Sequence, residues 1–328
     1  MSTTISTLLV NDKNRPLTKN RTRYTETDFP SNISGSKVRK VPTIIHAFDS
    51  LSELVEEMKS DCPKLKREFE RNCEYGEFEM SLDYDSREFV LERIAKGYAS
   101  DEGWSYYKNA KSKLLASPER IAKLGALGLD TRRKRRSDIA GCIVNIDKAM
   151  TGLNPMETFK RNNAQKSVRI FIDYSQSGSV DADRIIDTAT KAIAICEVLE
   201  KKGYATEISF GSTSWMDESS LRKNEFSGMK DVDFCIEMTK FIAKRAGEPI
   251  NESKLVNYCI AGIFRDILFN YWKGCLGFGS GLGYPLYTRL NPEENLEKYK
   301  KLVDADVYVG KRAHFSDILS DVVGVIRD

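Results

Sequence analysis

The stretch DYSQS, residues 173–177, holds the residues whose types and spacing best suit a chemical function. Asp173 follows an apolar run, and Ser175 and Ser177 come at alternate positions after it. One carboxylate and two hydroxyls supply hard oxygen ligands of the kind that Mg²⁺ accepts. Because alternate residues of an extended chain point to the same side, the three side chains converge, and the stretch predicts a metal site with Mg²⁺ as its cofactor.

A purely structural role is the alternative for the same stretch. Ser177, Ser179 and Asp181 can each cap the helix expected to follow, because their side-chain oxygens accept hydrogen bonds from its first N–H groups. We expect the turn at the carboxyl end of a strand, which is where α/β sheets bind their ligands. Both the metal site and the cap therefore stay open.

The residues around this turn argue against two further interpretations, a nucleotide-binding loop and a serine nucleophile. A nucleotide-binding loop needs closely spaced glycines, whereas only Gly178 is present and no Gly-Lys-Ser follows. A serine nucleophile needs a base, but the only histidines, His46 and His314, lie far away in the sequence, and no G-x-S-x-G motif occurs. With two histidines a histidine-based zinc site is also disfavoured. We therefore expect a protein that is not an enzyme.

A run of five consecutive cations is the second candidate site. Clustered cations displace counterions from nucleic acid, so the run predicts contacts with the phosphates of DNA or RNA. A solvated basic loop is the alternative. The run consists of Arg132, Arg133, Lys134, Arg135 and Arg136.

Three aromatic residues, Trp104, Tyr106 and Tyr107, allow two interpretations. They are either platforms on which bases stack or members of the core. The core is the preferred interpretation, because large rings at this spacing usually bury at least one member.

Composition limits the class of protein. The 328 residues are 41% hydrophobic, which is enough for a substantial core, and 51 Lys and Arg against 48 Asp and Glu give a net charge of only +3. We expect no membrane span and no secretion signal. Seven scattered cysteines without a C-x-x-C pair favour a reducing cytoplasm, with the thiols packed as small hydrophobic groups.

The chain is expected to have three parts. Residues 1–40 are predicted to be a disordered basic tail, because eight Lys and Arg stand among few apolar residues; an arm packed across the domain is the alternative. Residues 41–165 are predicted to form an α+β region that contains the basic loop, and residues 166–328 an α/β domain.

Periodicity predicts the elements of these parts. Strands that alternate with helices in residues 166–328 predict a helix-covered, largely parallel sheet. Ser50 and Glu53 have the spacing of a capping box for a helix over 51–58, and Gly203 is suited to end a helix. The expected strands are 41–48, 75–84, 167–173, 204–210, 232–242 and 305–310. The expected longer helices are 89–98, 101–128 with a break at Pro118, 181–203 and 251–274.

The D-x-S-x-S spacing of Asp173, Ser175 and Ser177 resembles von Willebrand factor A-type domains, which use a metal ion to grip a carboxylate of a partner. The resemblance implies a threonine on a second loop, for which Thr213 in FGSTS is the candidate. It also implies an aspartate after a later strand. Asp304 and Asp306 do not fit this position, because they precede their expected strand.

A longer pattern, from about residue 44 to about residue 290, resembles a family of phage-encoded proteins described only as a domain of unknown function. The resemblance implies a phage or prophage origin and one shared architecture, and it transfers no catalytic residue. Its most specific pieces are Gly103-Trp104, Ile139-Ala140-Gly141, Thr151 to Met156 and Gly247-Glu248-Pro249.

Three functions are compatible with these features. The first is a binding factor that acts on nucleic acid as an accessory of phage transcription or replication. The second is a von Willebrand A-like adaptor that docks a phage or host protein, such as an ATPase of the MoxR type. The third is a structural protein of the virion. For the first two we expect the host cytoplasm as the location.

Overall fold

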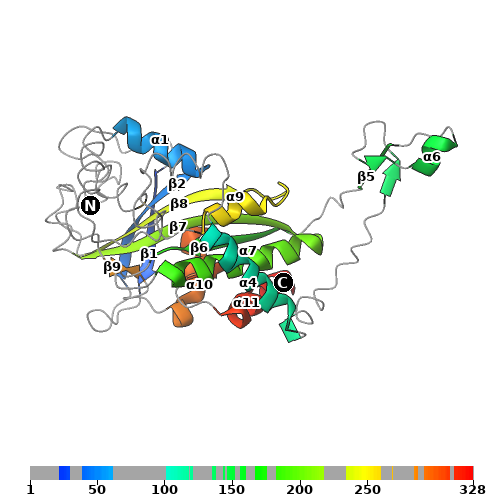
Figure 1. Ribbon diagram of the computed structural model, residues 1–328. Coiled ribbons are helices and arrows are strands. Elements are labelled where there is room, and N and C mark those ends of the chain that lie inside the picture. Colours follow the sequence, from blue (N-terminus) through cyan, green and yellow to red (C-terminus); the bar gives the residue numbers. More distant parts are fainter. Residues whose placement is uncertain are drawn as a thin grey trace.

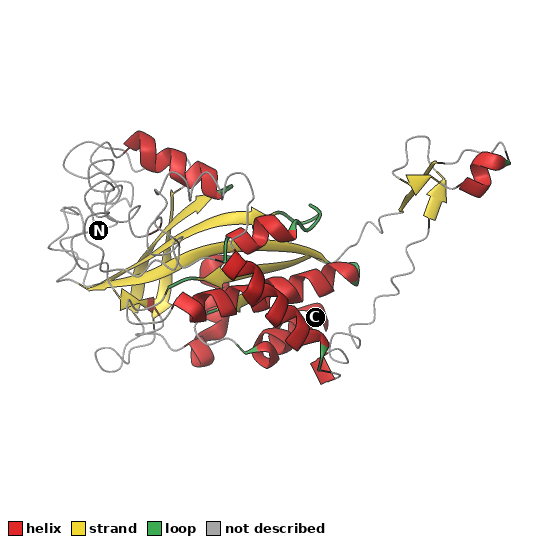
Figure 2. Ribbon diagram, in the orientation of Figure 1, coloured by secondary structure: helices red, strands yellow, loops and turns green. Residues whose placement is uncertain are grey.

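A mixed sheet covered by helices forms the centre of the computed structural model (Figures 1 and 2). The strand order is β1–β2–β8–β7–β6–β10, and the short β9 pairs with β7. The structure describes residues 22–29, 39–61, 101–117, 119–120, 135–137, 143–144, 146–151, 156–159, 167–175, 182–217, 234–259, 268, 284–286, 292–310 and 314–327.

The five strands from β2 to β10 are mostly parallel, as the sequence predicts. The pairs β2–β8, β7–β6 and β6–β10 are parallel, whereas β8–β7 is antiparallel. The outer pair β1–β2 and the pair β7–β9 are antiparallel as well. The strands are β1 (Thr22–Phe29), β2 (Arg39–Phe48), β6 (Ser167–Asp173), β7 (Ala205–Asp217), β8 (Phe234–Lys244), β9 (Tyr284–Pro285) and β10 (Val307–Val309).

Helices cover both faces of this sheet (Figure 2). The face that carries α7, α9 and α11, with α4 packed on α7, is called the α7 face below; α10 packs on the opposite face, called the α10 face. The helices are α1 (Leu51–Asp61), α4 (Asp101–Leu115), α7 (Ala182–Lys201), α9 (Glu252–Asn257), α10 (Pro292–Val303) and α11 (Phe315–Arg327). Among the described residues, no helix combines the length and apolar character that crossing a membrane requires.

The N-terminal part contributes to the same sheet. Residues 22–29, which fall in the segment predicted to be a disordered tail, form β1 and pair with β2 over eight positions. Residues 22–29 therefore form an arm that packs on the domain, which was the alternative to a disordered tail. Residues 1–21 and 30–38 lie outside the described part. β2 pairs in turn with β8, so the boundary expected near residue 165 does not divide this sheet.

A second, three-stranded sheet lies between α4 and β6 in the sequence. Its order is β3–β5–β4, and both pairings are antiparallel. Its elements are β3 (Arg135–Ser137), β4 (Ile143–Val144), α6 (Ile146–Met150) and β5 (Met156–Phe159).

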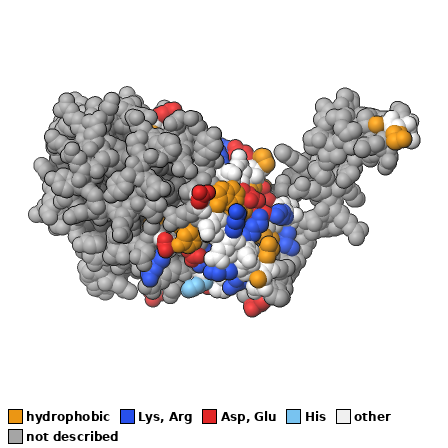
Figure 3. Space-filling model, viewed as in Figure 1, with side chains coloured by type: hydrophobic (Ala, Val, Ile, Leu, Met, Phe, Trp, Pro, Cys, Tyr) orange, Lys and Arg blue, Asp and Glu red, His pale blue; other side chains and the backbone are white. Residues whose placement is uncertain are grey.

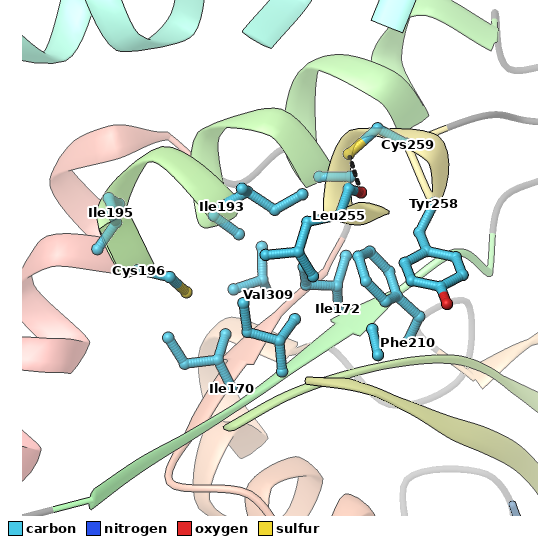
Figure 4. Close-up of a cluster of buried hydrophobic side chains, with 14 of the residues drawn as sticks. Ile170, Ile172, Ile193, Ile195, Cys196, Phe210, Leu255, Tyr258, Cys259 and Val309 are labelled. Atoms are coloured by element: carbon cyan, nitrogen blue, oxygen red, sulfur yellow. Dashed lines mark hydrogen bonds between the residues drawn. The ribbon is translucent and has the colours of Figure 1, made fainter. Parts of the chain in front are cut away.

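The core on the α7 face joins the sheet to its covering helices (Figure 4). Ile170 and Ile172 of β6 face Ile193 of α7, and Leu255 of α9 lies beside them. Cys196 and Cys259 are buried in this core as free thiols, which confirms for these two the role of small hydrophobic groups. Burial raises the pKa of both thiols, so they stay protonated.

Local signals in the sequence set several helix ends. Glu53 N donates to Ser50 Oγ (3.2 Å), so Ser50 caps α1 as predicted. The Glu53 carboxylate accepts from Asp49 N (2.6 Å) and not from Ser50 N, as it would in a complete capping box. Gly203 has a φ of 94° and ends α7, as predicted. Asn251 caps α9 by accepting from Lys254 N, as predicted, and this helix ends at Asn257, so the predicted helix 251–274 is interrupted there. Of residues 260–274, the structure describes only residue 268.

A buried carboxylate fastens α4 to α7. Glu197 accepts hydrogen bonds from Tyr107 Oη (2.6 Å) and Lys111 Nζ (2.8 Å), and it also pairs with Lys201. Burial opposes the charge, but these donors outweigh it and lower the pKa of Glu197 from 4.5 to about 2. The Glu197 carboxylate therefore stays ionised across the whole range in which other carboxylates take up protons.

We expect Glu197→Gln to remove the pH-dependent stabilisation that the ionised Glu197 carboxylate gives the folded protein. Because the folded-state pKa is lowered, the stabilisation is present above pH 4.5 and is lost as the pH falls toward 2. The variant should lose about 2 kcal/mol at pH 7, since solvent around the partly exposed Lys111 and the exposed Lys201 weakens the effect, and it should match the parent near pH 2. Urea unfolding at several pH values measures this, with the exposed Glu56→Gln as the control. A constant difference between parent and variant from pH 7 to pH 2 would contradict the assignment.

Candidate functional site

The predicted site residue Asp173 is the last residue of β6, at the carboxyl end of a parallel pair of strands. β6 and β7 run in the same direction, with Asp173 opposite Gly211 in the register. Tyr174 N donates to Gly211 O (2.8 Å), which continues the pairing beyond the end of β6. The strand therefore ends where the sequence predicts, and residues 174 and 175 follow it in an extended chain beside β7.

Asp173 and Ser175 point to the α10 face, and Thr213 of β7 meets them there. Ser175 N donates to Asp173 Oδ1 (2.7 Å), and Thr213 Oγ1 donates to Asp173 Oδ2 (2.8 Å). Ser175 Oγ donates to Thr213 O (2.8 Å) and lies 3.4 Å from Thr213 Oγ1. One carboxylate and two hydroxyls thus come together, but Thr213 lies within strand β7 and not on the second loop that the resemblance to von Willebrand A-type domains implies.

Tyr308 is a member of the cluster that the sequence analysis missed. Tyr308 of β10 donates from Oη to Asp173 Oδ2 (2.5 Å), and its ring lies against Phe171 and Tyr299. Tyr308 and Asp173 are 135 positions apart in the sequence. The parallel pairing of β10 with β6 brings them together. An added Cβ at Gly310 would lie 2.5 Å from the Tyr308 ring, so this glycine leaves the room that the ring needs.

Burial dominates the electrostatics of the cluster. Asp173 is 4% exposed, and desolvation raises its pKa, while the hydrogen bonds from Ser175, Tyr308 and Thr213 act in the opposite direction. A positive charge placed beside the carboxylate would reverse this effect, because it favours the ionised form. The cluster therefore consists of one buried carboxylate surrounded by hydroxyl groups.

The remaining residues considered for this site lie elsewhere or outside the described part. Ser177, Ser179 and Asp181 fall in residues 176–181, which the structure does not describe, so their predicted roles as ligand or cap stay predictions. Asp304 and Asp306 both bind Arg169, at the opposite end of β6 from Asp173. Among the described residues, no group of three or more His, Cys, Asp and Glu side chains is placed to hold a metal ion. A metal at Asp173 would therefore rely on hydroxyls for its other protein ligands.

The basic run is described only in part. Arg135 and Arg136 belong to β3, an edge strand of the small sheet that pairs with β5. Arg132, Arg133 and Lys134 lie outside the described residues. The predicted phosphate contacts of the run remain predictions.

The aromatic residues of α4 divide between core and surface. Tyr107 is 1% exposed and belongs to the core, which confirms the preferred interpretation for this ring. Trp104 and Tyr106 are only partly buried against the same core, and Lys108 Nζ lies 5.8 Å from the centre of the Trp104 ring. The described surface in Figure 3 carries basic side chains beside acidic and hydrophobic ones, so it has no single sign of charge.

Comparison with known proteins gives one match. The model of the family described as "Domain of unknown function (DUF7192)" matches residues 26–317. No curated protein and no solved structure matches the chain. The matched segment runs from β1 into α11 and includes the Asp173 cluster. The protein therefore belongs to the DUF7192 family, a domain family of unknown function.

Proposed function

We propose that the protein is a non-enzymatic adaptor that docks a protein partner through a Mg²⁺ ion held by Asp173, Ser175 and Thr213. The observation that carries the proposal is the convergence of these three side chains at the carboxyl end of β6, beside the part of β7 that extends past it. The D-x-S-x-S spacing by itself is also compatible with a helix cap. A cap does not require Thr213, which comes from another strand, so the contact of Thr213 with Asp173 favours the metal site.

The donor set suits the proposed ion. Carboxylate and hydroxyl oxygens are the ligands that Mg²⁺ accepts, and Mg²⁺ keeps several waters when a protein supplies few ligands. Burial lowers the effective dielectric around the carboxylate, which strengthens its attraction for a cation. A carboxylate of the partner would then replace one of the waters on the ion.

This proposal includes a von Willebrand A-like fold for the C-terminal part and a partner of protein nature. An ATPase of the MoxR type is the partner that fold analogy suggests. We also propose a phage or prophage origin and action in the host cytoplasm. The neighbours of the gene test this part: a MoxR-type gene beside it supports the adaptor, whereas adjacent capsid or tail genes favour a virion component.

Thermal unfolding tests whether the ion binds the native state. Mg²⁺ at a hundredfold excess over its Kd should stabilise the protein by about 2.7 kcal/mol by mass action and raise its Tm relative to the protein in chelator. Asp173→Asn should abolish the Tm shift, and Asp304→Asn, at the opposite end of the sheet, should preserve it. Equal Tm values for the parent with Mg²⁺ and with chelator would leave a helix cap as the better account.

Nucleic-acid binding is the second candidate, favoured by the partly exposed Trp104 with Lys108 beside its ring on α4. An aromatic face next to a cation is a surface on which an unpaired base stacks. With the basic run 132–136 supplying phosphate contacts, the protein would act as an accessory of phage transcription or replication.

The salt dependence of binding tests this candidate. Each neutralised phosphate contributes a slope of about −0.7 for a single strand. Changing Arg132, Arg133, Arg135 and Arg136 to serine should flatten the slope by about two to three units. Residues 1–40 should be kept in this experiment, because their deletion would also remove β1. An unchanged slope would identify the run as a solvated loop.

A further inference from the structure

We propose that a second polar cluster, on the α7 face of the sheet, binds a divalent transition-metal ion such as Zn²⁺ or Mn²⁺. The cluster, called the His46 cluster below, consists of His46 of β2, Glu237 of β8, and Ser212 and Ser214 of β7. It is separate from the Asp173 cluster and does not depend on the function proposed there.

Strand register places the His46 cluster on one face. Ser214 lies opposite Glu237 in the antiparallel pair β7–β8, and Ser212 lies opposite Thr239. Thr239 lies in turn opposite His46 in the parallel pair β8–β2. Because successive residues of β7 alternate between faces, Thr213 turns to Asp173 on the α10 face while its two neighbours turn to the α7 face.

The side-chain oxygens of the cluster are buried and make no hydrogen bond. Glu237 is 1% exposed and His46 is 2% exposed, and both serines are buried as well. Neither carboxylate oxygen of Glu237 makes a hydrogen bond, and the same holds for Ser212 Oγ and Ser214 Oγ. Buried polar atoms in native proteins nearly always have a partner, so this group of four oxygens requires one.

The contact between His46 and Glu237 does not by itself supply partners for these four oxygens. His46 Nε2 lies 3.2 Å from Glu237 Oε1, but the orientation is not that of a hydrogen bond. A buried ion pair offsets its desolvation only when further hydrogen bonds satisfy the remaining lone pairs. Here the second carboxylate oxygen and both serine oxygens are left over.

A metal ion suits these atoms better than the pair alone. Two ligands bound to one ion at about 2.0–2.2 Å are separated by roughly 3 Å when they are adjacent, which agrees with the 3.2 Å between Nε2 and Oε1. Imidazole together with carboxylate favours Zn²⁺ or Mn²⁺ over Mg²⁺. Ser214, opposite Glu237, is the hydroxyl best placed to complete the site with water.

The pKa of Glu237 agrees with a site for a metal ion. Burial raises the pKa of Glu237, because nothing in its surroundings offsets the loss of water around the charge except His46. A bound divalent cation would restore the ionised form. Ordered water is the alternative partner for the same oxygens, and it would hold no metal.

Cobalt binding to the full-length protein tests the proposal. After treatment with chelator, the parent should bind Co²⁺ with the visible absorption of nitrogen and oxygen ligands, and Zn²⁺ should displace it. Glu237→Gln and His46→Asn should each weaken binding at least about tenfold. Asp304→Asn, at an exposed aspartate outside both polar clusters, should leave it unchanged. Circular dichroism checks that each variant is folded.

Three results would overturn the proposal. The first is a parent protein that binds neither Co²⁺ nor Zn²⁺, a measurement that needs no variant. The second is binding that persists unchanged in both Glu237→Gln and His46→Asn. The third is a thiolate-to-cobalt absorption band in the near ultraviolet, which would place the ion on cysteines.

Discussion

Replacing Phe210 with alanine is expected to lower the free energy of unfolding by about 3–5 kcal/mol. Phe210 of β7 is fully buried, and its ring contacts Tyr174, Phe241 and Tyr258 at centroid distances of 5.2, 5.9 and 5.6 Å. Alanine would remove the ring from three aromatic neighbours and leave a cavity beside β6, β8 and α9. Denaturant unfolding measures the change.

A matched control separates this loss from a general effect of truncation. Leu115 at the end of α4 is 51% exposed, so Leu115→Ala should change the stability by no more than about 0.5 kcal/mol. Similar losses for Phe210→Ala and Leu115→Ala would contradict the placement of Phe210 in the core.

Gly211→Ala is expected to cost about 3 kcal/mol for the opposite reason, because it adds an atom where there is no room. A Cβ at this position would lie 2.1 Å from the carbonyl oxygen of Thr239 in β8 and 3.0 Å from the Phe171 ring. The backbone oxygen cannot move without disturbing the β7–β8 pairing. Gly211 O also accepts the hydrogen bond from Tyr174 N, so the change should disturb the Asp173 cluster as well.

The same substitution in α11 provides the control. Nothing lies within 4 Å of a Cβ built at Gly324. Gly324→Ala should therefore stabilise the protein, by up to about 1 kcal/mol, because alanine favours the helix. Chemical denaturation of both variants measures the contrast, and a Gly211→Ala protein as stable as the parent would refute the close approach of β7 to β8.

The sequence was sufficient for the elements of the α/β part because their signals are local. The apolar run 168–172 predicts β6, and the three- and four-residue spacing after it predicts α7, which ends at Gly203. Strand pairing is not a local property. The antiparallel pair β7–β8 and the addition of β1 and β2 to the same sheet depend on contacts between distant segments, and the alternation in residues 22–29 is too weak to predict a strand.

In the candidate site, too, the residues that follow a local motif could be predicted from the sequence, and those brought in by strand pairing could not. Asp173 and Ser175 are recognisable from their spacing, and a resemblance to a known motif identified Thr213. Tyr308 and the His46 cluster carry no such signal. In the sequence, Tyr308 and His46 look like ordinary core residues of apolar strands. The pairing of the strands brings Tyr308 to the carboxylate of Asp173 and His46 to that of Glu237.

The most direct test of the central claim is titration calorimetry of Mg²⁺ into the chelator-treated protein, because it measures the ion at the Asp173 cluster without a partner. We predict one Mg²⁺ per chain, and binding should be lost in Asp173→Asn and weakened in Thr213→Val, which keeps the shape of the side chain but removes the hydroxyl oxygen. A parent protein that binds no Mg²⁺, or a Thr213→Val protein that binds it as the parent does, would contradict the account.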